Sequence, residues 1–93
     1  MNEEFLPLGS IVLLKGGTVP VVVIGYTVIE EGSSELWDYL GCAYPIGVMD
    51  PERNLLFKRN QIEKVLFVGY IDDDGKKFLN QLTESYKKIT ENQ

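Results

Sequence analysis

Histidine is absent from the 93-residue sequence, and cysteine and tryptophan each occur only once. Without histidine, the chain cannot form a Ser-His-Asp or Cys-His catalytic arrangement, or a metal site with imidazole ligands. Most hydrolase mechanisms are excluded for the same reason. We therefore expect a protein that is not an enzyme, with no catalytic residues, no cofactor and no metal ion.

The single cysteine, Cys42, has no second cysteine with which to form a disulfide within the chain. Long apolar runs are also missing, since no stretch approaches the roughly 20 residues that a membrane-spanning helix needs. The first four residues are Met-Asn-Glu-Glu, which lack the basic start of a signal peptide. We expect Cys42 to be a small core residue and the protein to be cytoplasmic, with no membrane partner.

Basic residues are outnumbered, with 9 Lys and Arg against 14 Asp and Glu, and the formal net charge is -5. Residues 1–50 hold seven acids and one base (net -6), whereas residues 51–93 hold seven acids and eight bases (net +1). This charge repels phosphate backbones, so we do not expect a nucleic-acid partner. The alternative is a basic stripe that binds RNA on a barrel surface, formed by Arg53, Lys58, Arg59 and Lys64 around Phe57.

Five apolar runs rich in β-branched and aromatic residues alternate with turn residues, which is typical of short antiparallel strands. Lys15-Gly16-Gly17 leads into a strand, so it predicts a hairpin turn and not a phosphate-binding loop. Gly25 interrupts the second run and predicts a bend there. The expected strands cover residues 10–14, 19–29, 36–44, 55–58 and 64–71, with a single 3₁₀-like turn over 59–63.

The end of the chain has helical periodicity over about residues 73–90. Asp72-Asp73-Asp74 is suited to capping this helix, and the alternative is a Ca²⁺ or Mg²⁺ ligand set. Two other acidic pairs, Glu30-Glu31 and Asp50/Glu52, lie in polar loops. We expect no burial there that would shift the pKa of a carboxyl group into the range that acid–base catalysis needs. The apolar positions of the helix are Phe78, Leu79, Leu82, Tyr86 and Ile89.

These elements predict a single domain over residues 1–93 that is mainly β. A five-stranded, strongly bent antiparallel sheet would form an SH3-like barrel over about residues 8–71, followed by the C-terminal helix. The alternative is a two-layer α+β sheet with the helix across one face. The sequence leaves the oligomeric state open.

The aromatic residues Trp37, Tyr39 and Tyr44 lie close together in the third strand and the turn after it. Such a cluster is either part of the core or a partner-binding patch, because Trp and Tyr are enriched at interface hot spots. We take Trp37, Tyr39 and Tyr44 as the candidate partner-binding residues.

Three segments together resemble a family of small uncharacterised proteins of Gram-positive bacteria encoded beside type VII secretion genes and LXG-type toxins. The segments are Leu6–Gly17, Asp38–Gly47 and Ile62–Asp72, the last with Val68-Gly69-Tyr70 ahead of the helix. The resemblance implies an accessory, chaperone or adaptor protein that binds a secreted toxin or another product of its own locus. A nucleic-acid-binding regulatory barrel and a toxin immunity protein are the alternatives.

Overall fold

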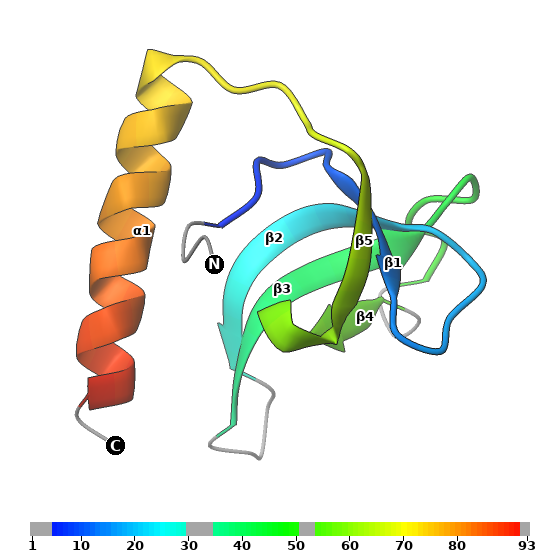
Figure 1. Ribbon diagram of the computed structural model, residues 1–93, viewed down its shortest axis with the longest axis horizontal. Helices are drawn as coiled ribbons and strands as arrows, with labels where there is room; N and C mark the ends of the chain where they lie inside the picture. Colours follow the sequence, from blue (N-terminus) through cyan, green and yellow to red (C-terminus); the bar gives the residue numbers. More distant parts are fainter. Residues whose placement is uncertain (1–4, 30–34, 51–53, 92–93) are drawn as a thin grey trace.

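The computed structural model describes residues 5–29, 35–50 and 54–91. Five antiparallel strands form one sheet, and a 19-residue helix follows it (Figure 1), as the sequence predicts. The elements are β1 (Ile11–Leu14), β2 (Val21–Ile29), β3 (Leu36–Ala43), β4 (Leu55–Phe57), the 3₁₀ helix η2 (Arg59–Gln61), β5 (Ile62–Phe67) and α1 (Asp73–Glu91).

The strand order is β4-β3-β2-β1-β5, so β4 and β5 are the two edges of the sheet. The long strands β2 and β3 curve around the core in Figure 1. The single turn η2 joins β4 to β5, and this short connection holds the start of one edge strand near the end of the other. The result is the strongly bent, SH3-like arrangement expected from the sequence.

Gly25 marks an irregularity in the pairing of β2 with β3. Val23 pairs with Gly41 and Gly25 pairs with Leu40, so two steps along β2 match one step along β3. This extra residue is a β-bulge, which bends a strand and increases its twist. The bend predicted at Gly25 is therefore confirmed, and it is one source of the curvature of the sheet.

The core lies inside the curved sheet and under α1. Val12, Val21 and Val23 from β1 and β2 meet Tyr39 and Phe57 from β3 and β4, and Phe5 and Leu79 complete the same cluster. Cys42 is also buried, as predicted, and it is a free thiol. Burial of aliphatic and aromatic side chains stabilises such a fold by about 1.5–3 kcal/mol for each fully buried one.

Helix α1 begins where the sequence predicts, because Asp72 caps it. The Asp72 Oδ1 atom accepts a hydrogen bond of 2.8 Å from the Gly75 N–H. Of the predicted apolar stripe, Leu79 is buried, Leu82 and Tyr86 are partly buried, and Phe78 is 52% exposed. Ile89 is helical, but its side chain lies outside the described part. Within the described residues, no helix combines the length and apolar character needed to cross a membrane.

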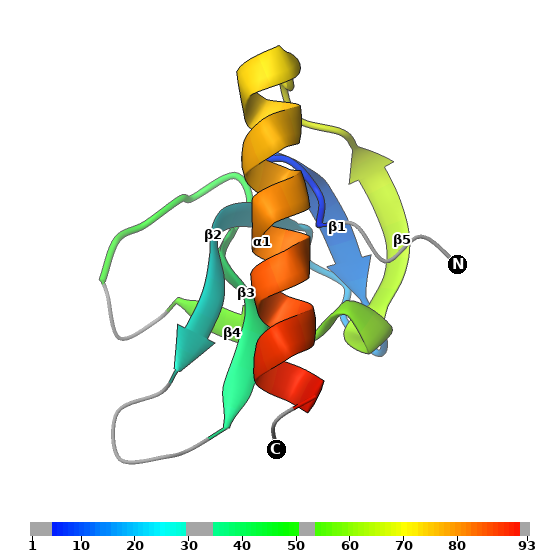
Figure 2. The same ribbon diagram turned by 90° about the vertical axis from the view of Figure 1, so that its left-hand side faces the viewer.

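Figure 2 shows α1 lying in front of the strands, and Figure 1 shows the N-terminal segment, in dark blue, between α1 and β1. Phe5 of that segment makes an edge-to-face contact with Tyr86 of α1, with ring centroids 5.5 Å apart. It also contacts Tyr39 of β3 in the same geometry at 5.4 Å. Phe5 therefore connects the helix to the sheet.

The last strand differs from its predicted range of residues 64–71, because β5 covers Ile62–Phe67. It begins earlier, since Ile62 still pairs with Leu14 of β1. It ends earlier because the buried Gly69 N–H donates a 2.9 Å hydrogen bond to the Ser10 Oγ atom. This side-chain acceptor replaces a ladder partner, so the chain leaves the sheet and turns towards α1.

Candidate interaction surface

Tyr39 is a core residue and not part of a surface patch. Only 1% of its area is exposed, and its ring stacks on Phe57 with centroids 5.2 Å apart. Its hydroxyl oxygen accepts a 2.9 Å hydrogen bond from the Leu6 N–H. Burial raises the pKa of Tyr39 above its usual value. The sequence-based candidate Tyr39 is therefore corrected, because a partner cannot reach it.

Trp37 is partly buried near the far end of the same strand. Lys58 lies over its indole ring, with Nζ 5.3 Å from the ring centroid. The Lys58 ammonium also forms an exposed ion pair of 2.7 Å with Glu35, and this hydrogen bond raises the pKa of Lys58. The indole Nε1 atom is buried without a hydrogen-bond partner in the described part of the chain. Trp37 is thus covered on one face by residues of its own chain.

Tyr44 is the only one of the three candidates with a largely exposed side chain, at 49%. It follows β3 at the end opposite Trp37, and its N–H donates to the Pro20 carbonyl oxygen. The turn that it begins carries three more exposed apolar side chains: Ile46, Val48 and Met49. The structure therefore separates the three candidates, and Tyr44 belongs to an apolar loop that we call the β3–β4 loop patch (Tyr44, Ile46, Val48 and Met49).

The basic residues proposed as a nucleic-acid stripe mostly make contacts within the chain. The Arg59 guanidinium lies over the rings of Phe5 and Tyr86, at 5.1 Å and 4.8 Å from their centroids. Its backbone N–H also donates a 2.7 Å hydrogen bond to the buried Asp38 carboxylate. Lys58 is held by Trp37 and Glu35. Arg53 lies outside the described residues. Of the three described basic residues of this stripe, Lys64 is the exposed one for which the structure gives no contact with another side chain.

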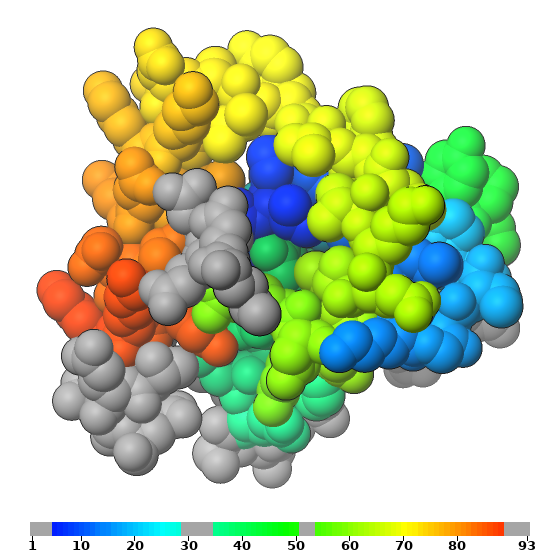
Figure 3. Space-filling model, in the orientation of Figure 1, coloured from blue at the N-terminus to red at the C-terminus, as the bar shows by residue number. Residues whose placement is uncertain are grey.

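The sequence did not reveal the longest run of consecutive exposed apolar side chains in the described part of the chain, which covers the end of β5 and the residue after it. Val65, Leu66, Phe67 and Val68 are consecutive, and each is between 42% and 57% exposed. Within the described residues, β5 pairs with β1 on one side and with no strand on the other. We call these four residues the β5 edge. Figure 3 shows the segment after η2, coloured from green to yellow, on the face turned towards the viewer.

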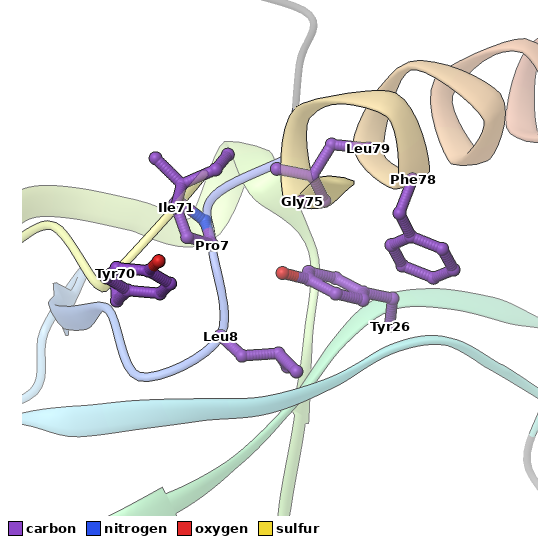
Figure 4. Close-up of a pocket in the computed structure, with 8 residues that line it drawn as sticks. All are labelled: Pro7, Leu8, Tyr26, Tyr70, Ile71, Gly75, Phe78 and Leu79. Atoms are coloured by element: carbon purple, nitrogen blue, oxygen red, sulfur yellow. The ribbon is translucent and has the colours of Figure 1, made fainter. Parts of the chain in front are cut away.

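A small apolar pocket lies between the sheet and the first turns of α1 (Figure 4). Its volume is about 110 Å³, and its walls come from Pro7, Leu8, Tyr26, Tyr70 and Ile71, and from α1. We call it the α1 pocket. The helix contributes Gly75, Phe78 and Leu79.

The two tyrosine hydroxyls of the α1 pocket already have partners. The Tyr26 hydroxyl donates to the Leu6 carbonyl oxygen, and the Tyr70 hydroxyl donates to Asp72 Oδ2 at 3.3 Å. Desolvation by burial, with a smaller effect of Tyr39, raises the pKa of Tyr26 to about 12. The interior of the pocket therefore presents carbon surface.

No group of three acidic or thiol side chains that could hold a metal ion occurs in residues 5–29, 35–50 and 54–91. Asp72 serves as the helix cap, so the capping interpretation of Asp72-Asp73-Asp74 is confirmed for its first member. Glu30, Glu31 and Glu52 lie outside the described residues.

A family model described as "Domain of unknown function (DUF4176)" matches residues 5–78, from Phe5 to the first turns of α1. Neither a search of curated proteins nor a search of solved structures found a match.

Proposed function

The chain belongs to the DUF4176 family of domains of unknown function, and from this premise we propose that it is a non-enzymatic protein-interaction module. In this proposal it is an accessory protein, either a chaperone or an adaptor, that binds an LXG-type toxin before type VII secretion. The secretion context comes from the family resemblance described above. The claim that the partner is a protein comes from the β5 edge.

The β5 edge is the observation that supports a protein partner. Four consecutive apolar side chains on an exposed edge are rarely left uncovered, since such an edge can pair with other strands and aggregate. Consecutive residues of a strand point to opposite faces of the sheet. A helix lying on one face would cover only alternate residues, whereas a strand added to the edge contacts side chains on both faces and also pairs with the backbone of β5.

A nucleic-acid partner is less well supported by the described residues. Lys58 and Arg59 are engaged with Glu35, Trp37, Phe5 and Tyr86, as described above. Proteins that bind nucleic acid by neutralising phosphates need several free cations on one face. The net charge of -5 opposes such binding at long range.

The test is co-purification of the tagged protein with the LXG-type toxin encoded beside its own gene. We expect a stoichiometric complex that survives 0.5 M NaCl, because apolar contacts are not screened by salt. Leu66→Lys should lose most of the capture, since it places a charge in the centre of the β5 edge. Met49→Lys is the matched control, because Met49 is 73% exposed in the β3–β4 loop patch, and it should capture the toxin like the wild type.

Three outcomes would contradict the proposal. Capture of nucleic acid that falls steeply with salt would support the regulatory barrel instead. Loss of capture in Met49→Lys but not in Leu66→Lys would move the interface to the loop patch. If deletion of the gene leaves toxin export unchanged but exposes the producing cell to the toxin, the protein is an immunity factor.

A further inference from the structure

We propose that the α1 pocket binds one apolar side chain of a partner polypeptide, of about the size of leucine and next to a lysine or arginine. This inference rests on the proposed function for the claim that the ligand is a protein. It names the chemistry of the segment that is recognised and a site separate from the β5 edge.

The size of the pocket selects a side chain over a metabolite. Its volume is about 110 Å³, whereas pockets for small-molecule ligands typically measure about 300–1,000 Å³. An apolar cavity of about 150 Å³ accommodates a benzene molecule. The α1 pocket is smaller than that cavity, so it accommodates one branched aliphatic side chain but not a nucleotide or a cofactor.

The lining of the pocket requires that this side chain be apolar. The hydroxyls of Tyr26 and Tyr70 are engaged with Leu6 and Asp72, so a polar group entering the pocket would lose its hydrogen bonds to water without replacing them. Burial of carbon surface against the tyrosine and phenylalanine rings is favourable at about 25 cal/mol per Å².

The opening of the pocket is built from exposed side chains. Tyr70, Leu8 and Phe78 are 83%, 54% and 52% exposed, and Figure 4 shows them around the cavity, with Tyr70 opposite Tyr26 and Phe78. A partner side chain that enters would cover all three. Tyr is among the residue types that contribute most at interfaces, because it buries a large area with few rotatable bonds.

Asp72 places a negative charge at the rim of the α1 pocket. This charge favours a basic residue next to the apolar residue of the partner. The exposed Asp72 contacts two lining residues, through the Tyr70 hydroxyl and the Gly75 N–H. Asp74 and Lys76 flank Gly75 along the helix with opposite charges and project from different sides of it. Asp73 and Lys77 project from the opposite face of α1 by helical spacing. Residues 72–77 hold three carboxylates and two ammonium groups, so this turn has a formal charge of -1. Asp72 is the carboxylate that contacts the lining residues, and a Lys or Arg beside the apolar residue would complement it.

The experiment selects ligands for the full chain from a phage-displayed library of random heptapeptides. We expect the enriched peptides to share a Leu, Ile or Met next to a Lys or Arg. Dissociation constants of the synthetic peptides are then measured by fluorescence polarisation. Tyr70→Ala should weaken binding by about tenfold or more, because it removes one wall of the pocket. Val19→Ala is the control, as an exposed apolar residue (53%) that does not line the pocket, and it should leave the dissociation constant unchanged.

Asp72→Asn tests the charge at the rim. Asparagine caps a helix as well as aspartate does, so this variant should fold like the wild type by circular dichroism. It should weaken binding by about three- to fivefold at 0.05 M NaCl and by much less at 1 M, where charges are screened beyond about 3 Å. An unchanged dissociation constant in Asp72→Asn would overturn the requirement for a basic neighbour.

The pocket assignment is overturned if no shared motif is enriched, or if the enriched peptides bind Tyr70→Ala as tightly as the wild type. A dimer in light scattering that Tyr70→Ala dissociates would identify a second copy of the chain as the occupant instead. Failure here is distinguishable from failure of the proposed function. Toxin capture that depends on Leu66 but not on Tyr70 would contradict only the pocket, whereas peptide binding without toxin capture would contradict only the proposed partner.

Discussion

At the scale of single residues, Gly69 occupies a position where the backbone of another segment takes the place of a side chain. An added Cβ would overlap the Leu8 carbonyl oxygen and lie 2.9 Å from the Ser10 nitrogen. Both atoms belong to the backbone, so they cannot move aside as a flexible side chain would. We predict that Gly69→Ala lowers the free energy of unfolding by about 2–4 kcal/mol, as measured by urea denaturation.

Gly75→Ala is the control for this prediction. Its added Cβ would lie 3.1 Å from Cγ1 of the Ile71 side chain, which can shift. Alanine also favours a helix over glycine by about 1 kcal/mol. We expect a change of less than about 1 kcal/mol in either direction. Equal effects of the two substitutions would contradict the close approach of Gly69 to the N-terminal segment.

The contribution of Tyr26 to stability should depend on pH. Burial raises its pKa in the folded protein from 10.0 to about 12. The folded state thus retains the phenolic proton at a pH where the unfolded state has lost it. The stabilisation due to Tyr26 is complete below pH 10 and is lost as the pH rises from about 10 to 12.

The measurement compares the wild type with Tyr26→Phe by denaturant unfolding between pH 8 and pH 11.5. At pH 8 the wild type should be more stable, because the Tyr26 hydroxyl donates to the Leu6 carbonyl oxygen. This advantage should decrease above pH 10, since Phe has no proton to lose. A difference that stays constant over the whole range would show that the Tyr26 hydroxyl is not held in the way described.

At the scale of elements, α1 buries only one of its two neighbouring apolar residues Phe78 and Leu79 in the core. Leu79 is 7% exposed and belongs to the core cluster, whereas Phe78 is 52% exposed. Leu79→Ala should lower the free energy of unfolding by about 2–5 kcal/mol, the usual range for a buried leucine. Phe78→Ala should cost less than about 1 kcal/mol. The midpoints of thermal unfolding can test both, and similar shifts would mean that α1 packs with a different face.

The sequence predicted the number, order and type of the elements because their patterns are local. Helical spacing from Phe78 onward and the acidic cap at Asp72 were enough to locate α1, and a glycine within an apolar run was enough to locate the bulge at Gly25. The end of β5 was wrong because it depends on a distant residue. The Ser10 Oγ atom, 59 positions away, accepts the hydrogen bond that removes Gly69 from the sheet.

The candidate site was predicted less well, since residue type does not reveal exposure. Trp37, Tyr39 and Tyr44 share a composition typical of interfaces, yet Tyr39 stacks on Phe57 in the core and Trp37 lies under Lys58. Conversely, the sequence of Val65–Val68 is entirely apolar and is typical of a buried strand. This segment is exposed because the topology puts β5 at an edge of the sheet. The apolar run carries no signal of this exposure, since a strand buried on both faces has the same pattern and only the strand order distinguishes the two.

At the scale of the whole molecule, a net charge of -5 coexists with three apolar surfaces: the β5 edge, the β3–β4 loop patch and the α1 pocket. Net charge keeps proteins apart in solution, but it does not cover an edge that can pair with another strand. Glu63 and Lys64 at the start of β5 offset each other. The edge itself is therefore neutral, and a chain without its partner has little local protection against self-pairing.

Leu66→Lys should improve the solubility of the isolated protein and at the same time weaken its function. Lysine on an edge strand opposes edge-to-edge pairing, so Leu66→Lys should raise the concentration at which the isolated protein begins to aggregate, as followed by static light scattering at 37 °C. The same substitution should reduce toxin capture, because the partner strand occupies the same edge. Met49→Lys adds an equal charge elsewhere and separates the effect of net charge from that of the edge. If both variants aggregate at the same concentration, net charge alone controls self-association; if Leu66→Lys resists aggregation but still captures the toxin fully, the partner binds elsewhere on the molecule.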